Sequence, residues 1–185
     1  MSNSRRKLRS PISAELGNFP ATMTSAEFIA LIDATLTWKD IEQFAADSRL
    51  PVVVKGVLRG DDARLAAEHG ARAVVVSNHG GRQLDTALSG ADALPGVVGA
   101  AGDQLDVLVD GGIRRGTDVL KALALGARAV MVGRPVLWGL AVSGALGVQR
   151  MLELLLAEFD TALALASAPR ADELDSSLVT KAPWA

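Results

Sequence analysis

The chain has 185 residues, of which 49% are hydrophobic and only 4% aromatic, and its formal net charge is −2. This length suits one domain with a core of its own, and the composition excludes a disordered or fibrous protein. The small net charge argues against a general attraction to nucleic acid or to an anionic membrane. Because the sequence has no cysteine, disulfides and thiolate chemistry are excluded.

Targeting and membrane segments are not expected. No apolar run reaches the roughly 20 residues that a membrane helix needs. The basic start, with Arg5, Arg6, Lys7 and Arg9, is not followed by the apolar stretch of a signal peptide. We therefore predict a cytoplasmic protein without a membrane segment.

Four Val-rich runs predict four strands. They are continuous instead of alternating, which is typical of strands that are buried on both faces of a parallel sheet. The strands are expected at residues 51–56, 73–77, 105–110 and 129–133.

Helical patterns lie before, between and after these runs. The sequence TWKD at 37–40 is a capping-box pattern that predicts a helix before the first strand. Asp61 and Asp62 are expected to cap a helix through Glu68, and Thr117 to begin a helix that ends near Gly126. A long apolar helix is predicted from Gly147 to about Ala166.

Strict alternation of helix and strand demands a parallel sheet, either open and doubly wound or closed as a (β/α)₈ barrel. The strands are about 21 to 32 residues apart, as in barrel units. Four units make half a barrel. Residues 1–35 and 171–185 are expected to be an irregular extension and a tail on either side of a domain at 36–170.

The segment SNHGGRQ at 77–83 follows the second strand directly. It places a titratable base, His79, three residues before a fixed cation, Arg82, at a strand end, where barrels keep their chemistry. A lone histidine is more often structural, and this placement makes the two interpretations of His79 about equal. No metal-ligand cluster is recognised.

Two glycine-rich loops follow the third and fourth strands. Gly111, Gly112, Ile113 and Arg114 form the first loop, and Gly133-Arg134 forms the second. In barrels such consecutive loops bind phosphate through backbone N–H groups, and arginine adds charge-assisted contacts. The alternative is tight turns with solvated arginines, which two loops in consecutive units disfavour.

Lys55 and Asp110 also stand at strand ends. Lys55 either extends to water or meets an anionic or electron-rich ligand. Asp110 either binds a hydroxyl group of a ligand or caps the following turn. The residues alone leave both alternatives open.

Taken together, these blocks resemble the FMN-dependent 2-hydroxy-acid oxidase/dehydrogenase family, whose fold is a TIM (β/α)₈ barrel. The order and spacing agree from about residue 36 to about 167. The matching text is LTWKDI at 36–41, VKGV at 54–57, SNHGGRQLD at 77–85, DGGIRRGTD at 110–118, KALALGA at 121–127 and GRP at 133–135.

The resemblance implies oxidation of a small L-2-hydroxy acid, such as glycolate, lactate or mandelate, to the 2-oxo acid with FMN as cofactor. His79 would be the base and Arg82 would bind the substrate carboxylate. The cofactor contacts would come from Lys55 at flavin N1/O2, Ser77 near the flavin, Asp110 at the ribityl hydroxyls, and Gly111, Gly112, Ile113, Arg114, Gly133 and Arg134 at the phosphate.

The chain matches only the second half of such a barrel, strands five to eight. The first half supplies active-site tyrosines and an aspartate that pairs with the catalytic histidine, and this chain has no tyrosine. Arg5 or Arg6 is a poor match to a substrate-binding arginine after strand four. We therefore expect a homo-oligomer or a complementary half-barrel as partner. The alternative is a non-catalytic half-barrel that retains a phosphate site, and a relative of inosine-monophosphate dehydrogenase is disfavoured because a catalytic cysteine is missing.

Overall fold

The computed structural model describes residues 23–181. The chain divides into a unit at Met1–Thr37 and a unit at Trp38–Ala185. In the first unit, helix α1 (Ser25–Ala30) begins after Thr24, whose Oγ1 accepts from the Glu27 N–H at 3.2 Å. Irregular structure was therefore the wrong expectation for residues 25–30, while Arg5 and Arg6 lie outside the described residues.

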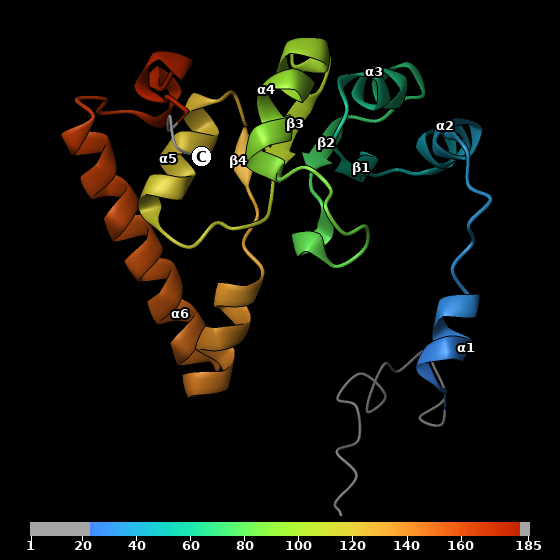
Figure 1. Cartoon of the computed structure of the whole chain (residues 1–185), viewed down its shortest axis with the longest axis horizontal. Coiled ribbons are helices and arrows are strands. Elements are labelled where there is room, and N and C mark those ends of the chain that lie inside the picture. Colours follow the sequence, from blue (N-terminus) through green and yellow to red (C-terminus); the bar gives the residue numbers. More distant parts are fainter. Residues whose placement is uncertain (1–22, 182–185) are drawn as a thin grey trace, which may run out of the picture. The chain divides into compact units, whose positions relative to one another are not determined.

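The second unit contains an all-parallel sheet of four strands in the order β1-β2-β3-β4 (Figure 1). Each strand lies within a predicted Val-rich run or extends one residue past it, so the predicted α/β class is confirmed. The bounds are Val53–Val57 for β1, Ala73–Val76 for β2, Asp106–Val109 for β3 and Ala129–Val130 for β4.

The helices of this unit are α2 (Trp38–Asp47), α3 (Gly60–Glu68), α4 (Gly90–Ala101), α5 (Gly116–Ala124) and α6 (Arg134–Leu165), with short 3₁₀ turns η2 (His79–Gly81), η3 (Ala171–Glu173) and η4 (Ser176–Leu178). Helices α3, α4 and α5 connect successive strands, while α2 precedes β1 and α6 follows β4.

Two predicted helix starts were wrong by one or two residues. Arg59 precedes α3 and makes no side-chain cap, so Asp61 and Asp62 lie in the first turn, where carboxylates still interact favourably with the helix dipole. Helix α5 begins at Gly116 instead of Thr117.

Helix α6 begins 13 residues before the predicted Gly147 and folds back on itself (Figure 1). Ser143 (φ −152°) and Gly144 (φ +58°) interrupt the helical backbone and divide α6 into two arms. Gly139 and Gly147 bring the arms into backbone contact, because a Cβ on Gly147 would lie 1.9 Å from the Gly139 oxygen.

By length and composition alone, α6 is one helix that could cross a membrane, and 6% of its most apolar window is buried. The break at Ser143 and Gly144 leaves a first arm too short to span a bilayer, which needs about 20 residues. The second arm carries Arg150, Glu153 and Glu158, so we treat α6 as a surface hairpin.

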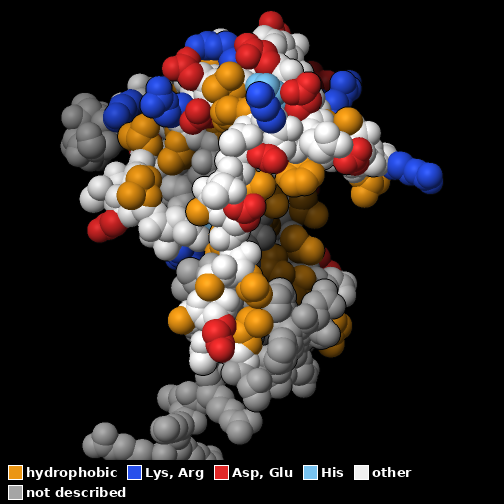
Figure 2. All heavy atoms as spheres, turned by 90° about the vertical axis from the view of Figure 1, so that its right-hand side faces the viewer, with side chains coloured by type: hydrophobic (Ala, Val, Ile, Leu, Met, Phe, Trp, Pro, Cys, Tyr) orange, Lys and Arg blue, Asp and Glu red, His pale blue; other side chains and the backbone are white. Residues whose placement is uncertain are grey.

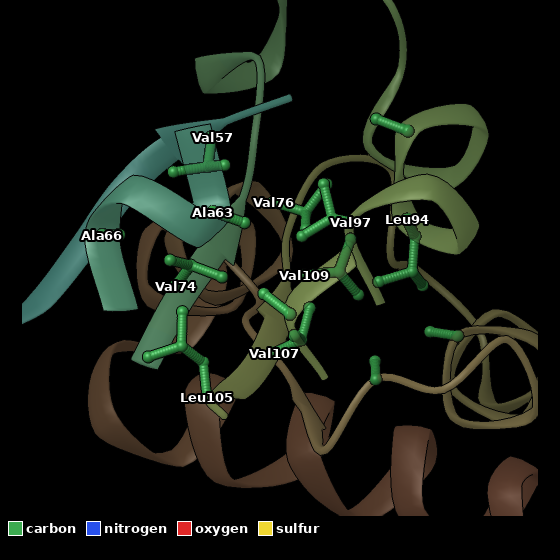
Figure 3. Close-up of a cluster of buried hydrophobic side chains, with 14 of the residues drawn as sticks. Val57, Ala63, Ala66, Val74, Val76, Leu94, Val97, Leu105, Val107 and Val109 are labelled. Carbon is green, nitrogen blue, oxygen red and sulfur yellow. The ribbon is translucent and has the colours of Figure 1, made fainter. Parts of the chain in front are cut away.

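The core lies between one face of the sheet and helices α3, α4 and α5. Side chains alternate along a strand, and Val74, Val76, Val107 and Val109 share the helix-covered face. Figure 3 shows these valines directed toward the helices, with Leu94 and Val97 of α4, Ala63 and Ala66 of α3, and with Val57 and Leu105 in the same cluster.

The opposite face of the sheet is less well covered. Val53 on β1 is 48% exposed, and Met131, just beyond β4, is 41% exposed. Lys55 shares this face with Val75 and is its register partner. The face that carries Lys55 is therefore open at its edge strands, whereas Val75 at its centre is only 2% exposed.

Charges of both signs are mixed on the surface. On the face drawn in Figure 2, Lys and Arg side chains alternate with Asp and Glu, and hydrophobic side chains show between them. Among the described residues, Arg59 and Arg64 both pair with Asp61. This face offers no broad area of one sign.

Candidate functional site

Three residues from three adjacent strands meet at the carboxyl edge of the sheet. Lys55 Nζ donates to Ser77 Oγ at 2.9 Å and lies 2.9 Å from Asp110 Oδ2. The parallel order β1-β2-β3 requires this proximity, because Ser77 follows β2 and Asp110 follows β3. Lys55 is thereby held on the face of the sheet opposite the helices, with its ammonium group paired.

A β-bulge directs Lys55 into this position. The register pairs Lys55 with Val75 but Val57 with Val76, so Gly56 is the extra residue of β1. Gly56 has φ +100°, a backbone conformation that glycine adopts without steric cost. Bulges commonly redirect a side chain beside a functional site.

Asp110 has an unused acceptor. Its Oδ2 pairs with Lys55, while Oδ1 is buried without a hydrogen-bond partner among the described residues. A buried polar atom without a partner costs free energy, so such an atom indicates a missing ligand or water. The backbone of Asp110 is supported from below by α4, since a Cβ on Gly90 would lie 2.7 Å from the Asp110 oxygen.

His79 stands on a strained turn. His79, Gly80 and Gly81 all have positive φ, at 56°, 65° and 72°, and only the glycines adopt this region freely. The His79 N–H donates to Ser77 Oγ at 3.0 Å, which ties the turn to the Lys55 cluster. Strain of this kind concentrates at functional sites.

Asn78 closes this turn, and sequence analysis assigned it no role. Its Oδ1 accepts from the Gly81 N–H at 3.1 Å, and its Nδ2 donates to the Leu88 oxygen at 3.2 Å. The signal was present, because asparagine after a strand often bonds to the backbone two or three residues on.

The side chains of His79 and Arg82 are exposed, and neither has a hydrogen-bond or ion-pair partner within residues 23–181. His69, the other histidine, is engaged elsewhere: its ring stacks on Trp38 and its Nδ1 lies 3.3 Å from Glu42. His79 is therefore the histidine that is available for proton transfer in this part of the chain.

The backbone of the first glycine loop, at residues 111–114, lies beside the turn that carries His79. Gly111 and Gly112 have φ values of +90° and +79°, and Gly111 lies beside Asn78, whose Oδ1 is 3.9 Å from a Cβ placed there. Ile113 is 9% exposed and belongs to the core cluster. Ile113 can therefore contact a ligand through its backbone alone.

The two arginines of the loops take different positions. The Arg114 guanidinium lies 5.6 Å above the Trp138 ring on the first arm of α6, a cation–π contact. Arg134 reaches back to the His79 turn, where its Nη2 would be 3.5 Å from a Cβ on Gly80. The second loop is thus adjacent to the turn that carries His79.

The donor set suits an organic anion more than a metal. Within residues 23–181, no group of three or more His, Asp or Glu side chains could hold a metal ion. Unpaired cations, exposed backbone N–H groups of glycine loops and one free carboxylate oxygen instead match phosphate and hydroxyl groups. The fold and site define an α/β protein with a base, cations and glycine loops at the carboxyl edge of a parallel sheet.

The chain belongs to the FMN-dependent dehydrogenase family, whose sequence model matches residues 4–181. It is 53% identical to an L-lactate oxidase of Nostoc sp. over 152 residues, 82% of this chain and 42% of the relative. It is 51% identical to the 2-hydroxyacid oxidase 1 of Mus musculus over 170 residues, 91% of this chain and 46% of the relative.

Solved structures give the same result. A mandelate oxidase with benzoyl-formic acid superimposes with a TM-score of 0.72 and 52% identity over 74% of this chain and 41% of that chain. A mandelate oxidase variant with an FMN adduct has the same score and identity over 44% of its length. The chain therefore spans less than half the length of the relatives that it matches here.

Proposed function

We propose that this chain is the flavin-binding half of an FMN-dependent enzyme that oxidises a small L-2-hydroxy acid to the 2-oxo acid. The observation that carries the proposal is the contact of Lys55 with Ser77 and Asp110 beside the His79 turn. The family and the lactate and 2-hydroxyacid oxidases among the relatives support the reaction class.

The described residues fit FMN. The orphaned Oδ1 of Asp110 is an acceptor for a ribityl hydroxyl, and Lys55 is a cation for the flavin N1/O2 edge. The glycine loops at 111–112 and at 133, with Arg114 and Arg134, are donors for the phosphate. Bound FMN would supply the two-electron acceptor for oxidation of the substrate α-carbon.

The chain's own groups would bind and deprotonate the substrate. Arg82, which has no described partner, would bind the carboxylate of the 2-hydroxy acid. His79 would accept the hydroxyl proton of the substrate, and the α-hydrogen would leave with two electrons as a hydride equivalent taken up by the cofactor, which yields the 2-oxo acid. Lys55 would stabilise the negative charge that this transfer leaves on the cofactor.

The fold is proposed to be the second half of a (β/α)₈ barrel. Four parallel strands in sequential order with helices on one face are what four barrel units would form. Both sheet edges are open, and Val53 and Met131 on or beside the other face are 48% and 41% exposed. We propose that the counterpart of the relatives' first half, or a second copy of this chain, covers that face.

The experiment compares the isolated chain with the chain co-expressed with the first half of a relative such as the Nostoc L-lactate oxidase. Flavin absorbance is recorded after FMN addition, and bleaching is followed under anaerobic conditions with L-lactate, glycolate or mandelate. We expect weak FMN binding and slow or no bleaching by the isolated chain, and fast bleaching by the complemented assembly.

His79→Ala is the decisive variant, and His69→Ala is its matched control on the other histidine. Bleaching that survives His79→Ala refutes the assignment of the base. A complemented assembly that binds FMN but is bleached by none of the three acids supports the non-catalytic alternative. Mass in solution distinguishes a heterologous pair from two copies of the chain.

A further inference from the structure

The N-terminus of α5 is occupied by two carboxylates. Asp118 Oδ2 accepts from the N–H groups of Arg114 and Arg115 at 3.0 and 2.9 Å. Glu158, from the second arm of α6, accepts from the Gly116 N–H at 3.0 Å through Oε2. These N–H groups are therefore satisfied within the chain and are not available to a phosphate.

Glu158 also contacts the preceding residue. Its Oε1 lies 3.3 Å from Arg115 Nη1, so one carboxylate holds both Arg115 and Gly116 across 42 residues of sequence. The helices touch at this point through their backbones, since a Cβ on Gly116 would lie 2.0 Å from the Phe159 nitrogen. Gly116 is buried, and any displacement of α6 here must move the start of α5.

We propose that Glu158 is a positioning residue that holds the Gly111–Arg114 loop in the geometry that binds the FMN phosphate. This inference rests on the proposed function. Glu158 anchors the loop at its downstream end, and β3 anchors it at its upstream end, where the Asp110 N–H donates to the Val76 oxygen at 3.1 Å. The N–H groups of Gly111 and Gly112, which have no backbone acceptor among residues 23–181, and the cation of Arg114 are thereby fixed relative to the sheet.

The hairpin formed by α6 also fixes the position of the second glycine loop, Gly133-Arg134. Its first arm begins at Arg134, directly after Gly133, and its second arm carries Glu158. The arms are locked together at Gly139 and Gly147. One element thus sets the positions of both glycine loops, and Glu158 acts on the first of them through Arg115 and Gly116.

The test compares FMN with riboflavin, which lacks the phosphate, on the full chain and on three variants. Flavin fluorescence quenching gives both dissociation constants. We expect Glu158→Ala to weaken FMN binding about tenfold, at the low end of the effect of losing a group that orients a binding residue, while riboflavin binding is unchanged. Glu158→Gln keeps an acceptor for the Gly116 N–H and should restore most of the affinity for FMN.

Glu153→Ala is the matched control, because Glu153 lies on the same arm and, among the described residues, bonds only to Gln149 and Arg150. It should leave both constants unchanged. Equal weakening of FMN and riboflavin by Glu158→Ala would show a merely structural role and overturn the proposal. Tighter FMN binding in both Glu158 variants would show that the Glu158 carboxylate acts only by repelling the FMN phosphate. That result would also overturn the proposal.

Amide hydrogen exchange separates this inference from the proposed function. Glu158→Ala should speed exchange at Arg115 and Gly116 without any flavin present, and Glu153→Ala should not. Unchanged exchange overturns the positioning role whatever the chain binds. A wild-type chain that does not prefer FMN to riboflavin refutes the proposed phosphate site, while the exchange result still decides whether Glu158 holds the loop.

Discussion

The left-handed backbone of His79 makes a quantitative prediction about stability. His79 has φ +56°, between Ser77 and the two glycines of the turn. An L-residue in this region costs roughly 1–2 kcal/mol, and glycine loses roughly 0.5–1 kcal/mol more backbone entropy than alanine on folding. The difference predicts that His79→Gly is more stable than His79→Ala by about 0.5–1 kcal/mol.

Urea unfolding followed by far-UV circular dichroism measures this difference. In the complemented assembly both variants should lose substrate-dependent flavin bleaching, so stability and activity would change in opposite directions in His79→Gly. Ser167, with φ +55°, is the matched position away from the site, and Ser167→Gly should be stabilised relative to Ser167→Ala by a similar amount. Equal stability of the Gly and Ala variants at His79 would show that the turn relaxes and would refute the strain argument.

Three further substitutions test the support of the site. Lys55→Met removes the partner of the partly buried Asp110 and should lower the free energy of unfolding by about 1–2 kcal/mol, between the values for exposed and buried pairs; a loss below 0.3 kcal/mol in urea unfolding would contradict it. Gly90→Ala places a methyl group 2.7 Å from the Asp110 oxygen and should weaken flavin binding in a fluorescence titration, whereas Gly96→Ala, with open space around it, should not. Asn78→Ala removes two bonds from the His79 turn and should slow bleaching of the complemented assembly by at least tenfold, which stopped-flow absorbance measures against the wild-type assembly.

Much of the fold could be predicted because its signals are local. Four Val-rich runs placed the strands to within three residues, and their strict alternation with helices required parallel pairing. Parallel order then places the ends of neighbouring strands together. The contact of Lys55 with Ser77 and Asp110 follows from that order, although the bulge at Gly56 that directs Lys55 was not foreseen.

Two features could not be predicted from the sequence, the break in α6 and the role of Glu158. They depend on a backbone conformation with no clear sequence signal and on a contact between distant residues. The break at Ser143 and Gly144 lies in an apolar stretch that reads as continuous helix, and φ +58° at Gly144 leaves no periodic signal. Glu158 looks like an ordinary surface residue of an amphipathic helix. Its bond to Gly116, 42 residues away, exists only because α6 folds back.

The backbone contact between Gly139 and Gly147 leaves no room for even a methyl group between the arms of α6. The hairpin is consequently stiff, and both loops attached to it are arranged when the chain folds instead of when a ligand arrives. Such preorganisation reduces the entropy that binding must overcome. Replacement of Gly147 by alanine would therefore reduce ligand affinity from a position outside both glycine loops.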